Sequence, residues 1–156
     1  MHSAPDFVAA LDQLEDYVAA EGPFDGVLAF SQGAGLAAMH IVLKSLEGKS
    51  PPFKCAILFS SNEVYDPKAW LEHGMVQPMD NEVHGRPITI PTVVIYGAHD
   101  PYKDHSERLA KLCDPKRSFV VQHPGSHEIP GLGVKASIPE IVKSMRRAIT
   151  QAALEY

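Results

Sequence analysis

Four short apolar segments alternate with helical segments, and this alternation restricts the chain to few folds. The apolar segments cover residues 24–30, 53–60, 92–97 and 118–123. Short, nearly continuous apolar runs are typical of strands that are buried on both faces of a sheet. Strands that alternate with helices pair in parallel through right-handed crossovers. The sequence therefore predicts an α/β protein with a parallel sheet of about four strands and flanking helices.

The segments between the strands have the periodicity of helices, with one exception. Helices are predicted over residues 5–20, 32–46, 105–113 and 137–155. The interval 61–91 contains no clear strand and only a short predicted helix near residue 70. A loop of this length inside a compact domain is usually a lid or a binding loop. We predict one domain over residues 1–156, in which the interval 61–91 is a lid or substrate-binding insertion.

Composition and charge exclude several functional classes. The chain has 156 residues, of which 45% are hydrophobic and 21% charged, and its net charge is −5. These values are ordinary for a soluble globular protein and do not suit a nucleic-acid partner. No apolar run approaches the length of a membrane span, and the first residues lack the layout of a signal peptide. With only two cysteines, Cys55 and Cys113, we expect a cytoplasmic protein.

Ser31 stands where the first predicted strand turns into a helix. Small residues, Ala29 and Gly33, lie two positions before and after it, so that the strand and the helix can approach closely. This is the pattern of a nucleophile elbow, in which a strained turn presents a serine hydroxyl. The new helix points its amide end at the serine, so we expect the Gln32 N–H to serve as an oxyanion donor. Alternatively, Ser31 caps the helix and has no chemical role.

An acid and a histidine follow later strands. Asp100 comes after the third predicted strand and His127 after the fourth. Sites of open α/β sheets lie at the carboxyl ends of strands, and the order Ser, Asp, His is that of the α/β-hydrolase triad. Taken singly, Asp100 could cap the next helix and His127 could be an ordinary loop histidine. Together with Ser31 they predict a triad, in which His127 bonds the serine with one ring nitrogen and Asp100 with the other.

The interval 61–91 carries apolar side chains among polar ones, including Trp70, Met75 and Met79. Such a group can form a small satellite core, or it can line a pocket for an apolar substrate. We predict that these three residues bind substrate and that the interval forms one wall of an apolar pocket over Ser31.

Three blocks of the sequence resemble a known family. They are GPFDGVLAFSQGAGLAA (22–38), IPTVVIYGAHDPY (90–102) and VVQHPGSHEIP (120–130). In combination they resemble the fungal-type serine hydrolases of the α/β-hydrolase superfamily. The resemblance implies esterases or thioesterases that act on short-to-medium acyl groups, several of which release an acyl chain from the carrier of a fungal polyketide synthase.

Carried over to this chain, the resemblance implies that Ser31 is the nucleophile, Asp100 the acid and His127 the base. Members of the family normally begin with further strands and a His-Gly turn, which supplies a second oxyanion donor. Neither precedes Ser31 here. We therefore expect a truncated α/β-hydrolase with weak hydrolysis, because loss of one donor costs about two to three orders of magnitude in rate.

The same departure has a consequence for assembly. Without a neighbour on its far side, the first strand would expose four apolar residues at the edge of the sheet: Phe24, Val27, Leu28 and Phe30. An apolar edge without lysine or proline is a template for pairing with another chain. We therefore expect a homodimer, or a partner chain, bound through the edge strand of residues 24–30.

The functional prediction is a serine esterase or thioesterase in secondary metabolism. Its substrate would be a small-to-medium acyl or polyketide-like ester or thioester, free or bound to a carrier protein. The histidines and acids match no standard metal-ligand spacing, so no metal or cofactor is expected. One alternative is a non-hydrolytic cyclase, dehydratase or isomerase of the same fold that uses His127 for proton transfer. The other is a non-catalytic binding subunit.

Overall fold

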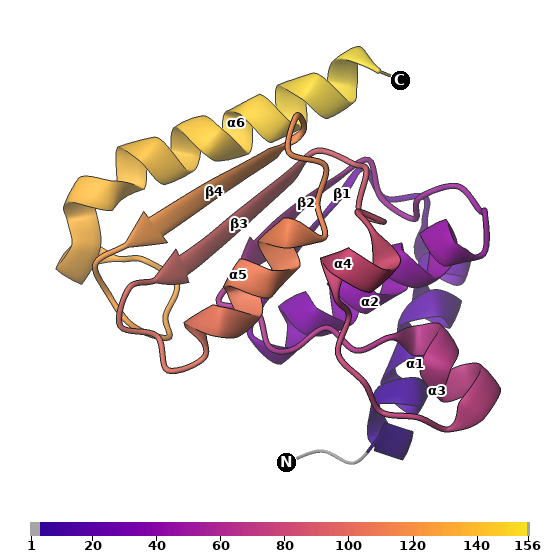
Figure 1. The fold of residues 1–156 in the computed structure, drawn as a ribbon. Helices are drawn as coiled ribbons and strands as arrows, with labels where there is room; N and C mark the ends of the chain where they lie inside the picture. Colours follow the sequence, from indigo (N-terminus) through magenta and orange to yellow (C-terminus); the bar gives the residue numbers. More distant parts are fainter. Residues whose placement is uncertain (1–3, 156) are drawn as a thin grey trace.

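The strands form one parallel sheet, and the computed structural model describes residues 4–155. The strand order is β1-β2-β3-β4, with bounds Gly26–Phe30, Cys55–Phe59, Thr92–Gly97 and Ser118–His123. Phe30 pairs with Phe59, and Gly97 pairs with His123. The strands therefore end along one edge of the sheet, where the segments after β1, β3 and β4 meet (Figure 1). The predicted α/β fold with about four parallel strands is confirmed.

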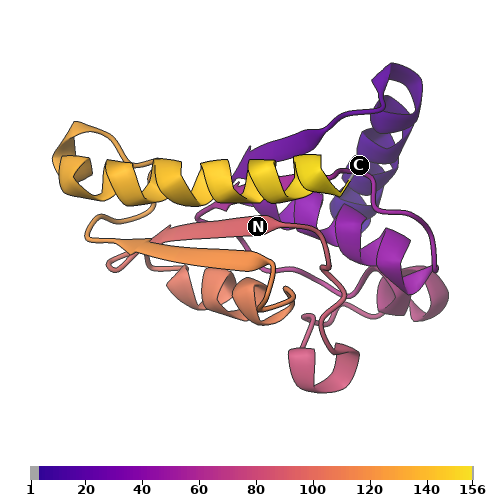
Figure 2. The same cartoon turned by 90° about the horizontal axis from the view of Figure 1, so that it is seen from above.

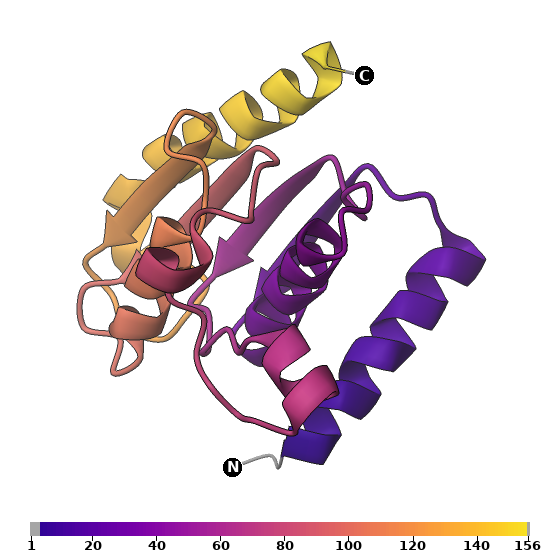
Figure 3. The ribbon, with the colours of Figure 1, turned by 45° about the vertical axis from the view of Figure 1, so that its right-hand side comes forward.

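Helices cover both faces of this sheet. They are α1 (Ala4–Glu21), α2 (Gln32–Leu46), α3 (Pro67–His73), α4 (Asn81–His84), α5 (Lys103–Lys111) and α6 (Ile138–Leu154), with a 3-10 helix at Leu132–Ser137. Figures 1 and 2 show α6 along one face of the sheet, and α2 and α5 on the other. Figure 3 shows α1 on the outer side of α2. Among residues 4–155, no helix is both long and apolar enough to cross a membrane.

The two central strands are buried at every position. Successive side chains of a strand point to opposite faces. Ile57 and Ile95 accordingly pack with Ile141 of α6, whereas Leu58 and Val94 belong to the larger cluster under α2 and α5. This double-sided core fixes the carboxyl ends of β2 and β3.

The interval 61–91 contains α3 and α4, and within the described residues it adds no strand to the sheet. Asp66 caps α3 by accepting hydrogen bonds from the Lys68 and Ala69 N–H groups at 2.9 and 3.1 Å. Its other oxygen lies 2.8 Å from His84 Nε2, so that one carboxylate ties α3 to α4. An isolated bridge between Tyr65 and Pro78 joins the segments before and after α3. The interval is thus held by its own contacts, and its role as a lid remains a prediction.

Strand β1 lies at one edge of the sheet and is exposed at alternate positions. Leu28 is 59% exposed and Phe30 is 36% exposed. Both lie on the α6 side of the sheet, because Leu28 pairs with Ile57 and Phe30 with Phe59. Phe24 and Val27, in contrast, are partly buried and pack against the core under α2, so the exposure predicted for these two residues is wrong.

The homodimer through this edge remains a prediction. We expect the purified chain to be a dimer by light scattering at low micromolar concentration. Leu28→Lys should shift it to monomer, because lysine on a strand edge opposes pairing. Leu132→Lys is the matched control, since Leu132 is 89% exposed and lies in the 3-10 helix. A monomeric native chain would contradict the prediction.

Candidate active site

Ser31 occupies the turn between β1 and α2 in a strained backbone conformation. Its φ is 56° and its ψ is −119°, a region that residues other than glycine rarely adopt. The Ser31 N–H donates to the Phe59 carbonyl at 2.9 Å, and the Ser31 carbonyl accepts from the Asn62 N–H at 3.1 Å. The side chain makes no capping hydrogen bond to α2. Ser31 thus occupies the N-cap position of α2, but its hydroxyl does not cap the helix.

The neighbouring backbone comes closest at Gly35, and not at Gly33, the glycine that the sequence analysis identifies. A Cβ added at Gly33 would lie 3.9 Å from the Ala29 Cβ, which is an ordinary contact. A Cβ added at Gly35 would lie 3.1 Å from the Glu63 carbonyl oxygen. The requirement for a small residue is thus stronger two residues further along α2, where the segment after β2 crosses the helix.

Ser31, His127 and Asp100 form one hydrogen-bonded chain. Ser31 Oγ lies 2.9 Å from His127 Nε2, and His127 Nδ1 lies 3.0 Å from Asp100 Oδ2. A carboxylate only accepts, so Nδ1 carries the proton, and Nε2 of the neutral ring accepts from the serine hydroxyl. The Asp100 side chain is fully buried, whereas 26% of the His127 side chain is exposed. His127 can therefore contact a substrate that enters from solvent, while the buried Asp100 carboxylate holds the orientation of its ring.

Asp100 has a second contact, in the turn that follows it. Its Oδ1 accepts from the Tyr102 N–H at 2.8 Å, in the turn that leads into α5. Asp100 does not cap α5, because the N-cap of that helix is Tyr102 and no side chain caps it. The contact uses one carboxylate oxygen and leaves the other for His127.

The comparisons with known proteins identify the family. The family model described as "Serine hydrolase (FSH1)" matches residues 1–136. The chain belongs to this serine hydrolase family. Esterase FPY3 of Fusarium mangiferae is 38% identical over 154 residues, which are 98% of this chain and 69% of that relative.

Solved structures of low sequence identity share the fold of this FSH1-family chain. A fungal esterase from Rhizomucor miehei matches 92% of the chain with a TM-score of 0.55 and 15% identity, over 58% of its own length. A monoacylglycerol lipase of Paleococcus ferrophilus matches 90% of the chain with a TM-score of 0.60 and 12% identity, over 76% of its own length. The predicted parallel α/β fold is thus shared with these esterase and lipase structures.

Gly97 places the histidine loop of the FSH1-family site. A Cβ at Gly97 would lie 2.3 Å from the Ser126 carbonyl oxygen and 2.4 Å from that of Gly125. The loop after β4 therefore crosses directly over the end of β3. The His99 N–H donates to the Gly125 carbonyl at 3.0 Å and fastens the two loops together. The sequence gives no such role to Gly97, which is simply the last residue of a predicted strand.

Two aromatic rings flank His127, and neither is predicted from the sequence. The Phe30 ring centroid lies 5.2 Å from that of His127, and the Tyr102 ring stands edge-on to His127 at 5.6 Å. Tyr102 also stacks on His105 at 5.8 Å. Phe30 immediately precedes the serine and Tyr102 comes two residues after the acid, so their nearness in sequence is the only signal that could have found them.

Two other histidines, His40 and His123, are packing residues. His40 and His123 are each 1% exposed. Burial lowers the pKa of both rings. The carboxylate of Glu47 opposes this shift at His40, and the carboxylates of Glu128 and Asp100 oppose it at His123, but burial is the larger effect. His40 meets the Phe53 ring edge-on, and His123 Nδ1 accepts from the Gly125 N–H at 3.1 Å. Neutral, buried rings suit structural roles.

The predicted oxyanion donor lies at the start of α2. The first N–H groups of a helix have no acceptor in a preceding turn, and Gln32 is the first residue of α2. Gln32 and Gly33 also line a hollow of about 170 Å³ together with Phe7 and Leu36. Gln32 thus borders a hollow, and the role of its N–H as an oxyanion donor remains a prediction.

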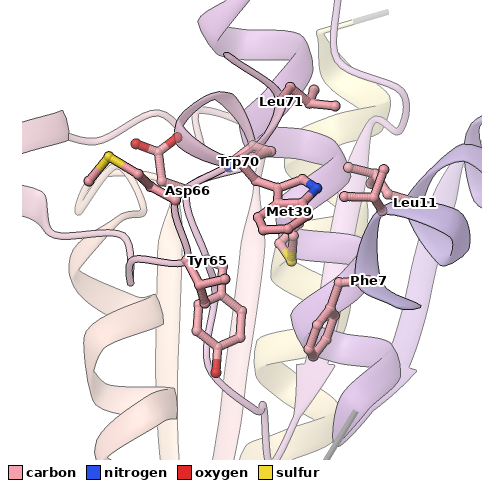
Figure 4. A pocket seen from close by; sticks show the side chains of 11 residues that line it. Phe7, Leu11, Met39, Tyr65, Asp66, Trp70 and Leu71 are labelled. Atoms are coloured by element: carbon pink, nitrogen blue, oxygen red, sulfur yellow. The ribbon is translucent and has the colours of Figure 1, made fainter. Parts of the chain in front are cut away.

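The structure does not bring the three predicted substrate-binding residues into one pocket. Trp70 and Met75 line an apolar pocket between α1, α2 and α3 (Figure 4). Met79 is 1% exposed in the main core, with its N–H on the Val64 carbonyl, and it does not line this pocket. The place predicted for Met79 is therefore wrong. Ser31 is not among the lining residues either, so the pocket lies beside α2 rather than directly over the serine.

Among the described residues, no group of three or more histidine, cysteine or acidic side chains is placed to hold a metal ion. Both cysteines are buried free thiols. Burial raises the pKa of the Cys113 thiol to about 12, which makes it a poor nucleophile. The nucleophile best placed in this chain is the Ser31 hydroxyl.

Proposed function

We propose that this chain is a serine esterase that cleaves small-to-medium acyl esters through Ser31, His127 and Asp100. The observation that carries the proposal is the hydrogen-bonded chain from Ser31 Oγ to His127 Nε2 at 2.9 Å and from His127 Nδ1 to Asp100 Oδ2 at 3.0 Å. Membership of a serine hydrolase family and the likeness to a Fusarium esterase support it.

Acylation follows from this geometry. Ser31 Oγ bonds to the carbonyl carbon as its proton passes to His127 Nε2. The carbonyl electron pair moves to the oxygen, where the Gln32 N–H stabilises the negative charge. Collapse of this intermediate expels the alcohol or thiol, which takes the proton from His127. Asp100 remains ionised and stabilises the imidazolium that forms between the two transfers.

Deacylation uses the same groups. Water gives a proton to His127 Nε2 and attacks the acyl-serine carbonyl, and Ser31 Oγ leaves and regains the proton. The ring keeps one orientation through both halves, because Asp100 holds Nδ1 while Phe30 and Tyr102 flank the ring. Thioesters, including acyl and polyketide-like chains on a carrier protein, fit the same steps, because only the leaving group differs.

Covalent labelling tests the nucleophile. A fluorophosphonate probe should lose fluoride and form one phosphorus–oxygen bond, which mass spectrometry of peptides should place on Ser31. His127→Ala should slow labelling by about two orders of magnitude or more, because it removes the base. His73→Ala is the control, since His73 is 66% exposed on α3 and remote in sequence from the site. Labelling on another residue, or equal rates in both variants, would contradict the proposal.

A further inference from the structure

We propose that the buried carboxylate of Glu63 and the ring of His105 are positioning residues for the base of the site. They hold the Tyr102 ring in place, and Tyr102 in turn packs against His127. The inference rests on the proposed esterase function and concerns side chains that its reaction steps do not use. These groups exchange no proton with the substrate and act only through the orientation of the His127 ring.

His127 needs support of this kind because it lies in the loop after β4, outside any helix or strand. In the described chain its ring has two hydrogen-bonded contacts, with Ser31 Oγ and with Asp100 Oδ2. The first contact is lost in the acyl-enzyme, because the oxygen of an acylated serine has no hydrogen to donate. During deacylation the ring is therefore held by Asp100 and by the aromatic rings beside it.

Tyr102 contacts both the acid and the base. Its N–H donates to Asp100 Oδ1 at 2.8 Å, and its ring lies at 76° to the His127 ring with centroids 5.6 Å apart. Aromatic rings at this separation and angle attract each other. Tyr102 is nevertheless 51% exposed, so burial alone does not hold its side chain. The ring needs a further contact to keep one orientation.

His105 supplies that contact from the first turn of α5. Its ring stacks on Tyr102 with centroids 5.8 Å apart and an angle of 28° between the planes. The His105 N–H donates to the Tyr102 carbonyl at 2.9 Å, which fixes the backbone between the two rings. His105 Nδ1 is buried and has no hydrogen-bond partner among the described residues. A buried polar atom without a partner is unfavourable, so the other contacts of the ring must hold it there.

Glu63 provides the contact at the other ring nitrogen. Its Oε2 lies 3.5 Å from His105 Nε2. The same carboxylate accepts from Arg108 Nε at 3.2 Å, and it also accepts from Arg108 Nη2. Glu63 is only 9% exposed, and a glutamate is seldom buried unless it is paired. Its position between two side chains of α5 thus ties His105 to the segment that follows β2.

The segment that carries Glu63 also contacts the nucleophile turn. The Asn62 N–H donates to the Ser31 carbonyl at 3.1 Å. The Ser61 N–H donates to Ser106 Oγ of α5 at 3.0 Å. Helix α5, which begins after the end of β3, is therefore connected to both sides of the site (Figure 1). Glu63 links the support of the base to the backbone that holds the serine.

Single variants measure the positioning. With p-nitrophenyl acetate, Tyr102→Ala should lower kcat by about tenfold or more and leave KM within about twofold, because the base is displaced while the substrate still binds. His105→Ala should lower kcat by about three- to tenfold for the same reason. Tyr102→Phe keeps the ring and should retain kcat. Tyr17→Ala and His73→Ala are the matched controls: Tyr17 is 59% exposed and stacks on Phe24 at 5.8 Å in α1, and His73 is exposed on α3.

The order of the contacts predicts effects that do not add. Glu63→Gln keeps the shape of the side chain but loses its charge, and should lower kcat by about threefold. In the Tyr102→Ala background, neither Glu63→Gln nor His105→Ala should lower kcat further, because both act through the Tyr102 ring. Effects that add in the double variants would overturn the proposal. A raised KM with unchanged kcat in Tyr102→Ala would also overturn it, since Tyr102 would then be a substrate contact.

A measurement without catalysis separates this proposal from the esterase function. The His127 Nδ1 proton, which is shared with Asp100, should give a downfield proton NMR resonance when it exchanges slowly with water. This resonance should be sharp in the native chain and in Tyr17→Ala, and broadened in Tyr102→Ala and His105→Ala. The same broadening in a chain that cleaves no ester would support the positioning while overturning the esterase. Native resonances and native kcat in both variants would overturn the positioning and leave the esterase intact.

Discussion

Replacement of Ser31 by alanine is expected to lower kcat for ester hydrolysis by at least about four orders of magnitude. The reason is that the hydroxyl on His127 Nε2 is the only nucleophile in the hydrogen-bonded chain that ends in Asp100. Without it, the base can only activate water, and the covalent route is lost. The measurement is the steady-state rate with p-nitrophenyl acetate, together with the thermal unfolding temperature of each variant.

The control for this variant lies in α2, the helix that follows Ser31. Ser45→Ala makes the same change at an exposed position near the end of α2 and should leave the rate unchanged. Ser31→Gly offers a second readout, because glycine adopts a φ of 56° without strain. It should raise the free energy of unfolding by about 1 kcal/mol while the activity is lost. A Ser31→Ala variant that kept its activity would show that the serine is not the nucleophile.

The sheet could be predicted from sequence because buried strands leave a strong local signal. The bounds of β3 and β4 match the predicted segments, and α2 begins and ends as predicted. The short helix α4 and the 3-10 helix were not predicted, since four to six residues are too few to show a helical period. The segments predicted for β1 and β2 are longer than the observed strands. They include flanking apolar residues that pack against the core but do not pair with a neighbouring strand.

The residues of the site also fall into those that the sequence predicts and those that it does not. Ser31, Asp100 and His127 could be found because each follows a strand, and parallel strands end at one edge. The role of Gly97 could not be predicted, because glycine is needed there only once the loop after β4 crosses the end of β3. Phe7 and Leu11 lie in the pocket because α1 packs on α2, and no local pattern predicts that contact. Met79 turned inward because the Tyr65–Pro78 bridge places the residue after Pro78 in the core.

The second large effect is expected at Asp100. Asp100→Asn should lower kcat by about four orders of magnitude, because the side-chain amide can donate to His127 Nδ1, where the carboxylate only accepts. The ring would then carry its proton on Nε2, which could no longer accept the proton of Ser31. The amide oxygen can still accept from the Tyr102 N–H, so the turn into α5 should remain. The rate with p-nitrophenyl acetate should fall while the near-ultraviolet circular dichroism stays native.

Asp114 provides a control in the same kind of turn. Its Oδ1 accepts from the Lys116 N–H at 2.9 Å, two residues on, as Asp100 accepts from Tyr102, and no hydrogen bond joins Asp114 to a histidine in the described chain. Asp114→Asn should therefore leave the rate unchanged. The comparison separates the turn from the contact with His127, since both variants replace a carboxylate by an amide and keep the local hydrogen bond. If the two variants had equal activity, Asp100 would be a turn residue only, and His127 would act without an orienting acid.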